Sequence, residues 1–90
     1  MKWVVYILEC GDGTLYTGST NNLARRLLRH RSGKGARYTR GRLPVRVVYC
    51  RRCPDRGAAL KREHAIKRLG RREKNALIAR SKINKKTARS

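Results

Sequence analysis

The sequence predicts a small α/β domain with the element order β-β-α-β-α-α and a three-stranded, mainly antiparallel sheet flanked by helices. Three observations carry this prediction. Short stretches rich in Val, Ile and Tyr read as strands, and they are separated by longer stretches with apolar residues at helical spacing. A Gly- and Asp-rich turn divides the first two strands. The length of 90 residues suits one domain.

Three stretches are predicted strands. The segment KWVVYILE, residues 2–9, is β-branched and aromatic, and TLYTG, residues 14–18, follows it after the turn CGDG. These two should pair as an antiparallel hairpin in which Tyr16 faces away from its immediate neighbours. The third strand is VRVVYC, residues 45–50.

Three helices are predicted between and after these strands. The first covers residues 23–31, where Leu recurs at helical spacing behind the capping run Ser-Thr-Asn-Asn. The second covers residues 56–69, with Asp55 as its cap and Gly70 placed to end it. The third covers residues 71–80.

Two segments have no predicted secondary structure. Residues 32–43, SGKGARYTRGRL, are Gly-rich and basic without a period, and a loop this long in a small domain suggests a function. Polar and basic residues follow position 81, so we expect a domain at 1–82 and a basic flexible tail at 83–90.

The charge points to a polyanionic partner. The chain has 25 Lys and Arg against 5 Asp and Glu, a formal net charge of +20. Nucleic acid is the expected partner because phosphate neutralisation supplies most non-specific affinity. An anionic membrane would require an amphipathic anchor with large exposed hydrophobic residues, which is not evident. No membrane span or signal peptide is evident either, so we expect a cytoplasmic protein.

The three cysteines are Cys10, Cys50 and Cys53. An odd count without a secretion signal argues against a disulfide framework. The Cys50-x-x-Cys53 pair is compatible with half a zinc site or a redox pair, but no second paired motif completes four zinc ligands. Redox motifs usually open a helix, whereas here Pro54 intervenes, so a structural role is favoured.

A polar cluster is predicted where the second strand turns into the first helix. Tyr16 closes the strand, and Gly18 permits a sharp turn. Asn22, Arg26 and His30 recur at i, i+4 and i+8 and should line one stripe of the helix. A phenol, a phosphate-binding guanidinium and an imidazole can then converge. The alternative is a buried tyrosine beside a solvated basic helix face.

Glu63 stands out because it is one of only five acidic residues and lies on or beside the apolar stripe of its predicted helix. A carboxylate at the core edge needs a partner, either an arginine or a metal. An i, i+4 pair with Lys67 satisfies the same need, and the residues alone do not decide between these alternatives.

Four segments carry a resemblance to a known family: VVYIL, LYTGSTNNLARRLLRH, GARYTRGRLPVRVVY and ALKREHAIKRLGRREKNALI. Together they resemble the GIY-YIG nuclease superfamily, most of all its small single-domain bacterial members, up to about residue 82. They are also similar to the catalytic domain of eukaryotic nucleases that cut branched DNA. Residues 4–6, VVY, stand where Gly-Ile-Tyr would, and residues 16–18 read YTG, in which Gly18 matches the turn glycine.

The resemblance implies roles for the matching residues. Tyr6 and Tyr16 match the signature tyrosines, one of which serves as general base through its phenolate. Arg26 holds the scissile phosphate, and His30 assists proton transfer. Glu63 binds a single divalent cation, typically Mg²⁺. The implied reaction is hydrolysis of a phosphodiester by in-line attack of water.

A tyrosine that works as a base near neutral pH must have its pKa lowered from about 10 by about 2–3. One cation about 4 Å away supplies on the order of 4 kcal/mol at an effective dielectric near 20, which is enough. The many arginines of the chain, or a divalent ion, are therefore expected to lower the pKa of the catalytic phenol.

The basic loop is expected to contact substrate. Its Lys and Arg side chains can follow a phosphate backbone while Tyr38 stacks on an exposed base, although a solvated flexible loop is the alternative. The predicted substrate contacts are Gly18, Asn22, Lys34, Arg37, Tyr38 and Arg40.

We therefore expect a metal-dependent endonuclease that hydrolyses DNA, with a preference for branched or damaged DNA in repair or recombination. The alternative is a non-catalytic nucleic-acid-binding module that retains the fold. Catalysis requires both phenols, the guanidinium and the carboxylate to meet in one exposed pocket, with Glu63 on the same side of the sheet as Tyr16.

Overall fold

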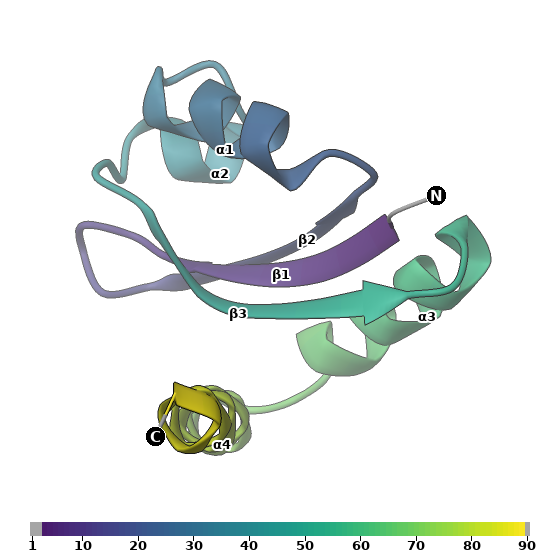
Figure 1. The fold of residues 1–90 in the computed structure, drawn as a ribbon. Coiled ribbons are helices and arrows are strands. Elements are labelled where there is room, and N and C mark those ends of the chain that lie inside the picture. Colours follow the sequence, from purple (N-terminus) through teal and green to yellow (C-terminus); the bar gives the residue numbers. More distant parts are fainter. Residues whose placement is uncertain (1–2, 90) are drawn as a thin grey trace.

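The structure, a computed structural model, describes residues 3–89 and the side chains within that range, except those of Arg37 and residues 82–89. The described part of the chain forms three strands and four helices (Figure 1). In chain order these are β1 (Trp3–Glu9), β2 (Leu15–Thr20), α1 (Leu23–Arg31), α2 (Arg37–Arg40), β3 (Arg46–Cys53), α3 (Arg56–Lys67) and α4 (Arg71–Arg89). The predicted α/β class and element order are confirmed, with one short helix added.

The sheet has the order β2-β1-β3, and both pairs are antiparallel. β1 is central, so β2 and β3 are the two edges. The register places Tyr6 opposite Gly18 and Leu8 opposite Tyr16. Because side chains alternate along a strand, these four residues share one face of the sheet. Figure 1 shows α1 and α2 over one face and α3 and α4 over the other.

Two apolar clusters fill the space on either side of β1. One contains Tyr6, Leu8, Cys10 and Val45, with Leu23 and Leu27 of α1 packed against it. The other contains Val5, Ile7, Tyr49 and Ile66, with Leu77 and Ile78 of α4 against it. The central strand is therefore buried on both faces, which explains why its sequence is a continuous apolar run instead of an alternating one.

Several predicted bounds differ from the structure, among them the end of α3, which lies at Lys67 instead of residue 69. β2 continues to Thr20, and β3 continues to Cys53, because pairing with β1 extends the edge strands past their apolar residues. The predicted loop contains α2, whose four residues are too few to show a period. α4 continues beyond the predicted end at residue 80, to Arg89, through residues without Gly or Pro. The division into a domain at 1–82 and a tail stays a prediction.

No helix among the described residues has the length and apolar character needed to cross a membrane.

Candidate active site at the edge of the sheet

Two tyrosines and a histidine meet on the face of the sheet that α1 covers. The ring centroids of Tyr6 and Tyr16 lie 6.5 Å apart, and His30 lies 6.1 Å from the first ring and 5.4 Å from the second. The hydroxyl oxygen of Tyr6 and Nε2 of His30 are 3.2 Å apart, within a hydrogen bond. The structure thus brings together three of the four predicted catalytic side chains through β1, β2 and α1.

Gly18 makes this arrangement possible in a way that the sequence did not indicate. It lies inside β2 and has no positive φ, so the expectation of a sharp turn at this residue is wrong. A Cβ at this position would stand 2.6 Å from Oη of Tyr6 and 3.2 Å from a ring carbon of Tyr16. Glycine is required because the Tyr6 hydroxyl lies directly over the β2 backbone.

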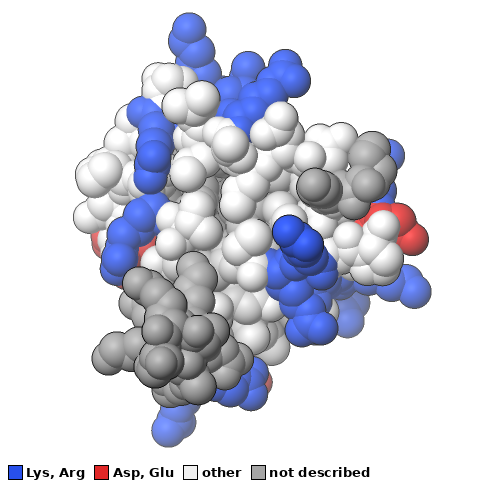
Figure 2. Space-filling model, viewed as in Figure 1, with Lys and Arg blue, Asp and Glu red and all other residues white. Residues whose placement is uncertain are grey.

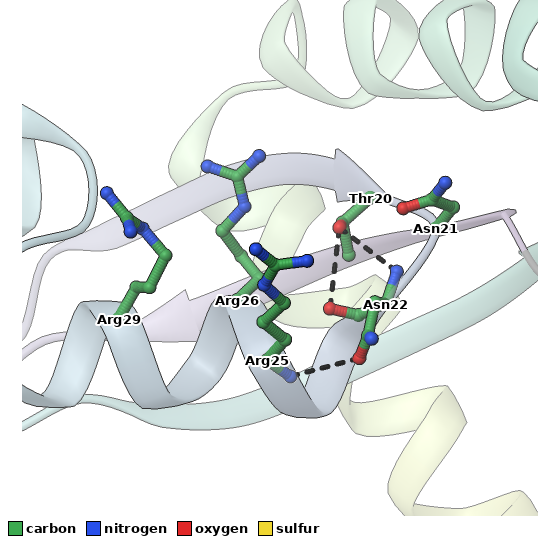
Figure 3. A pocket seen from close by; sticks show the side chains of 6 residues that line it. All are labelled: Thr20, Asn21, Asn22, Arg25, Arg26 and Arg29. Atoms are coloured by element: carbon green, nitrogen blue, oxygen red, sulfur yellow. Dashed lines mark hydrogen bonds between the residues drawn. The ribbon is translucent and has the colours of Figure 1, made fainter.

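A cleft lined with arginines lies near the aromatic cluster, close enough for Arg26 to affect the pKa of Tyr6 and of His30, although none of the three aromatic residues lines it. It has a volume of about 350 Å³ and lies between the end of β2 and α1. Its lining residues are Thr20, Asn21, Asn22, Arg25, Arg26 and Arg29 (Figure 3). The three arginine side chains extend from α1 toward the same side, so their guanidinium groups can share one phosphate group or two neighbouring ones.

Asn22, Arg26 and His30 do not form one stripe, contrary to the prediction. His30 is 1 % exposed and faces the core, whereas Asn22 and Arg26 are exposed. Eight residues of helix turn about 80° past a whole number of turns, which is enough to carry His30 into the core. Asn22 is the cap of α1, and its side-chain oxygen accepts a hydrogen bond from the backbone of Arg25 at 3.1 Å.

The phenol of Tyr6 and the imidazole of His30 are both held in their neutral forms. Burial, and then the nearby Tyr16, raise the pKa of Tyr6, and the opposing effect of Arg26 is smaller. Burial, and then Arg26, lower the pKa of His30 below its ordinary value of 6.5. At Tyr6 the loss of solvent outweighs the attraction of the guanidinium, so Arg26 does not by itself lower the pKa of this phenol. A divalent ion as the cation that lowers the pKa of the catalytic phenol stays a prediction.

Glu63 lies on the other face of the sheet. Its Oε1 accepts a hydrogen bond of 2.6 Å from the hydroxyl of Ser19, which is next to Gly18 on β2 and so points to the opposite face from Tyr16. Its Oε2 lies 2.7 Å from Nζ of Lys67, so the i, i+4 pair is present. The expectation that Glu63 and Tyr16 share one side is wrong, because α3 packs beneath the sheet.

The edge position of β2 nevertheless keeps Glu63 electrostatically close to the aromatic cluster. Its carboxylate contributes to raising the pKa of Tyr6 on the opposite face, after burial and Tyr16. Burial tends to raise the pKa of Glu63 itself, but hydrogen bonds from Lys67 and Ser19 outweigh it and lower that pKa. An ionised carboxylate and the arginine cleft thus flank the same edge strand, although Glu63 does not line the cleft.

Contacts of Arg42 hold the basic loop, residues 32–43, against the rest of the domain. The guanidinium of Arg42 lies 4.2 Å from the ring centre of Tyr38, donates to the Tyr38 carbonyl at 2.7 Å and pairs with Asp12 at 3.1 Å. The ring of Tyr38 stacks on Tyr16 at 5.9 Å. Tyr38 therefore packs against the aromatic cluster through Tyr16. The expectation that Tyr38 stacks on a nucleic-acid base stays a prediction.

The other predicted loop contacts are less defined. Lys34 and Arg40 are exposed, and the carbonyl of Lys34 accepts a hydrogen bond from Arg29 at 3.3 Å. The side chain of Arg37 lies outside the described part of the structure.

Sequence reasoning missed Thr39, which is 0 % exposed and lies on α2. Its hydroxyl oxygen is 2.8 Å from Nδ1 of His30 and donates to the carbonyl of Ala36 at 3.0 Å. The spacing of residues around a single Thr in a basic segment does not predict that its side chain is buried. Ser19, the partner of Glu63, was missed because only the docking of α3 reveals it.

The cysteine pair does not form a redox site. Cys50 and Cys53 both belong to β3, where residues three apart are separated by roughly 10 Å. A disulfide requires Cα atoms within about 7 Å, so the redox interpretation is wrong. Over the residues that the structure describes, no three His, Cys, Asp or Glu side chains form a group able to hold a metal.

Comparisons with known proteins agree with this arrangement. Residues 2–76 match the family model of the GIY-YIG catalytic domain. A UPF0213 protein of Desulfotalea psychrophila is 57 % identical over 77 residues, which cover 84 % of this chain and 70 % of the relative. One of Natronomonas pharaonis is 52 % identical over 75 residues, covering 83 % of this chain and 88 % of the relative.

Two solved structures are also similar. The solution NMR structure of a UPF0213 protein of Bacillus halodurans has a TM-score of 0.58 and 48 % identity, covering 88 % of this chain and 84 % of the other. That of a protein of E. faecalis has a TM-score of 0.58 and 39 % identity, covering 82 % and 79 %. The order of the motifs, the paired tyrosines over Gly18 and these matches lead to one conclusion: the chain belongs to the GIY-YIG family, among its small UPF0213 proteins.

Proposed function

We propose that this protein is a metal-dependent endonuclease that hydrolyses phosphodiester bonds in DNA. The observation that carries the proposal is the hydrogen bond between the buried Tyr6 hydroxyl and His30, next to a cleft into which three arginines extend. This arrangement offers a proton acceptor beside a phosphate-binding surface, and membership of the GIY-YIG family supports a nucleic-acid substrate.

In this proposal each group has one task. Arg26 binds the non-bridging oxygens of the scissile phosphate and stabilises the charge that develops on them. Tyr6 accepts the proton of the attacking water and passes its own hydroxyl proton to His30. Tyr16 packs beside Tyr6, and Tyr38 stacks on Tyr16, so these two rings support the position of Tyr6.

The carboxylate of Glu63 is a suitable ligand for a divalent ion, and Mg²⁺ is the ion that we propose. The carboxylate is held ionised by hydrogen bonds from Lys67 and Ser19, and ionised carboxylates are hard oxygen ligands of the kind that Mg²⁺ takes. Mg²⁺ commonly binds through one or two carboxylates and completes its coordination with water and substrate phosphate. Because Glu63 lies on the face of the sheet opposite Tyr16 and does not line the cleft, an ion held there would supply charge neutralisation to the phosphate only across the edge strand β2.

The substrate proposed is DNA, with branched or damaged forms preferred, as in repair or recombination. The net charge of +20 supports a polyanion, and the resemblance to nucleases that cut branched DNA supports the structural preference. The second candidate is a nucleic-acid-binding module without catalysis. Three observations favour it. Tyr6 is neutral, Lys67 contacts Glu63, and Glu63 lies on the face of the sheet opposite Tyr16, contrary to the requirement that the sequence set for catalysis.

The decisive experiment is nicking of supercoiled plasmid with Mg²⁺ or with EDTA, followed by a panel of flap, junction, single-stranded and duplex oligonucleotides. The test variant is Glu63→Gln. Its matched control is Glu73→Gln, whose amide oxygen can still accept from the N–H of Gly70.

We expect cleavage by the wild type only with Mg²⁺. We also expect a loss of roughly 10²-fold or more in Glu63→Gln and little change in the control. DNA binding without cleavage by the wild type would favour the binding module, and equal cleavage by Glu63→Gln would remove Glu63 from the site.

A further inference from the structure

We propose that Thr39 is a positioning residue that fixes the tautomer of His30, so that Nε2 of the imidazole accepts the proton of Tyr6. This inference deepens the proposed nuclease function and rests on it for its catalytic part. Thr39 itself touches neither the arginine cleft nor any reacting atom in the proposal, and it acts through His30.

The three residues form a continuous buried chain. Thr39, His30 and Tyr6 are 0 %, 1 % and 2 % exposed, so bulk water does not compete for their polar atoms. Oγ1 of Thr39 lies 2.8 Å from Nδ1 of His30, and Nε2 lies 3.2 Å from the Tyr6 hydroxyl. At the far end the Thr39 hydroxyl reaches the carbonyl of Ala36 at 3.0 Å.

The direction of the hydrogen bonds follows from counting protons and acceptors. A neutral imidazole has one N–H, and each hydroxyl has one proton to donate. If Nδ1 carries the hydrogen, it donates to Thr39, Thr39 donates to the Ala36 carbonyl, and Tyr6 donates to Nε2. Every proton then has an acceptor.

The other tautomer leaves one proton without an acceptor. With the hydrogen on Nε2, His30 donates to Tyr6, and the Tyr6 hydroxyl must find another acceptor. Among the described residues its hydrogen bond to His30 is the one available. A buried hydroxyl proton without a partner costs on the order of 1–3 kcal/mol, so the tautomer with hydrogen on Nδ1 is favoured.

The close approach of Gly35 helps to hold this orientation. A Cβ at residue 35 would overlap Nδ1 of His30 and would stand 2.8 Å from its Cα, so only glycine lets the chain pass here. The segment that leads into α2 is thereby packed against the imidazole, and Thr39 follows within the same short helix.

This tautomer gives a neutral Tyr6 a way to act as a base. As the water oxygen forms its bond to phosphorus, the water proton passes to Oη of Tyr6, and the proton of Tyr6 passes to Nε2. The bond from phosphorus to the leaving oxygen breaks, and that oxygen takes a proton from solvent. The imidazolium keeps its Nδ1 hydrogen bond to Thr39 and releases the gained proton to solvent after product leaves.

The first test measures the tautomer without any substrate, by imidazole ¹⁵N chemical shifts of wild type, Thr39→Val and Thr39→Ser. We expect His30 to carry its hydrogen on Nδ1 in the wild type and in Thr39→Ser, which keeps the hydroxyl. Thr39→Val should shift the population toward hydrogen on Nε2. His64, which is exposed, provides an internal reference.

The second test measures single-turnover cleavage and DNA affinity with the same variants. Thr39→Val should lose roughly 10²-fold in rate with unchanged affinity, and Thr39→Ser should recover most of it. A wild-type His30 with hydrogen on Nε2, or the same tautomer in Thr39→Val as in wild type, overturns the positioning role. Absence of cleavage by the wild type overturns the nuclease proposal instead, while the shifts still decide the role of Thr39.

Discussion

At the scale of single residues, the centre of the site is a pair of neutral groups, Tyr6 and His30, whose charged forms burial disfavours. A guanidinium about 4 Å from a phenol contributes on the order of 4 kcal/mol at an effective dielectric near 20. For Tyr6 this attraction is outweighed by the loss of solvent, and the pKa rises. We therefore propose that Tyr6 acts through a proton relay to His30, and not as a phenolate that is already ionised before substrate binds.

The buried His30 predicts a pH dependence of stability. Its folded pKa lies below the ordinary value of 6.5, so the unfolded chain binds more protons as pH falls below 6.5. The free energy of unfolding should therefore be highest above pH 6.5 and should fall as pH drops toward the folded pKa, by at most about 1.4 kcal/mol per pH unit.

Denaturant unfolding of wild type, His30→Gln and the exposed control His64→Gln between about pH 5 and 8 checks this, since carboxylates titrate below that range. His30→Gln should be less stable at neutral pH but flatter with pH, and His64→Gln should follow the wild type. Parallel curves for wild type and His30→Gln contradict the assignment.

At the scale of elements, the position of Glu63 depends on how α3 docks beneath the sheet. Asp55 caps this helix by accepting from the backbone of Ala58 at 2.8 Å, and Ala59 and Ile66 anchor it in the core. Glu63, one turn after Ala59, contacts Ser19 on the edge strand β2. Lys67 follows one turn later and lies against the same carboxylate.

This arrangement predicts that Lys67 competes with a divalent ion for Glu63. Lys67→Ala should lower the Mg²⁺ concentration that gives half-maximal cleavage by roughly 2–5-fold, as expected for the loss of one partly exposed charge pair. The matched control is Lys61→Ala, an exposed lysine of the same helix. An unchanged or higher half-maximal concentration in Lys67→Ala would show that the ion does not bind at Glu63.

At the scale of the whole molecule, positive charge dominates the surface. Figure 2 shows Lys and Arg side chains projecting from several sides of one face, while Asp and Glu form only small patches at its rim. Part of the acidic charge is also paired, as in the contacts of Asp12 with Arg42 and Glu9 with Arg46. Such a surface suits contact with a phosphate backbone over a wide area, whereas the proposed cleavage would be confined to the edge near β2.

DNA affinity should therefore depend steeply on salt. Neutralising about 6–10 phosphates lowers affinity by roughly 10³–10⁵ between 50 and 200 mM salt. Fluorescence anisotropy with a duplex oligonucleotide across this range measures the slope of log affinity against log salt. A flat response is incompatible with a polyanion-binding surface.

Local patterns predicted much of the fold. Residues 23–31 form α1 as expected, because Leu spacing and the Asn22 cap are local signals. The pairing of Tyr6 with Tyr16 followed from hairpin geometry. The side of the sheet that Glu63 occupies could not be predicted, because it depends on which face α3 covers.

Two features of the site, the helix α2 and the burial of His30, could not be predicted from the spacing of apolar residues. α2 is a single helical turn, and Thr39 gains its meaning only when the chain folds back over His30. The burial of His30 depends on the direction in which the last turn of α1 faces. Both follow from tertiary packing, and no local pattern in the sequence encodes them.

The central claim is that the arginine cleft beside the Tyr6–His30 pair holds the phosphate that is cleaved. The most direct measurement is single-turnover cleavage by Arg26→Ala beside Arg31→Ala, a matched exposed arginine on the same helix that does not line the cleft. We predict that Arg26→Ala abolishes cleavage while its circular dichroism and most of its DNA affinity are retained, and that Arg31→Ala cleaves like the wild type. Near-normal cleavage by Arg26→Ala, or an equal loss in both variants, would contradict the account.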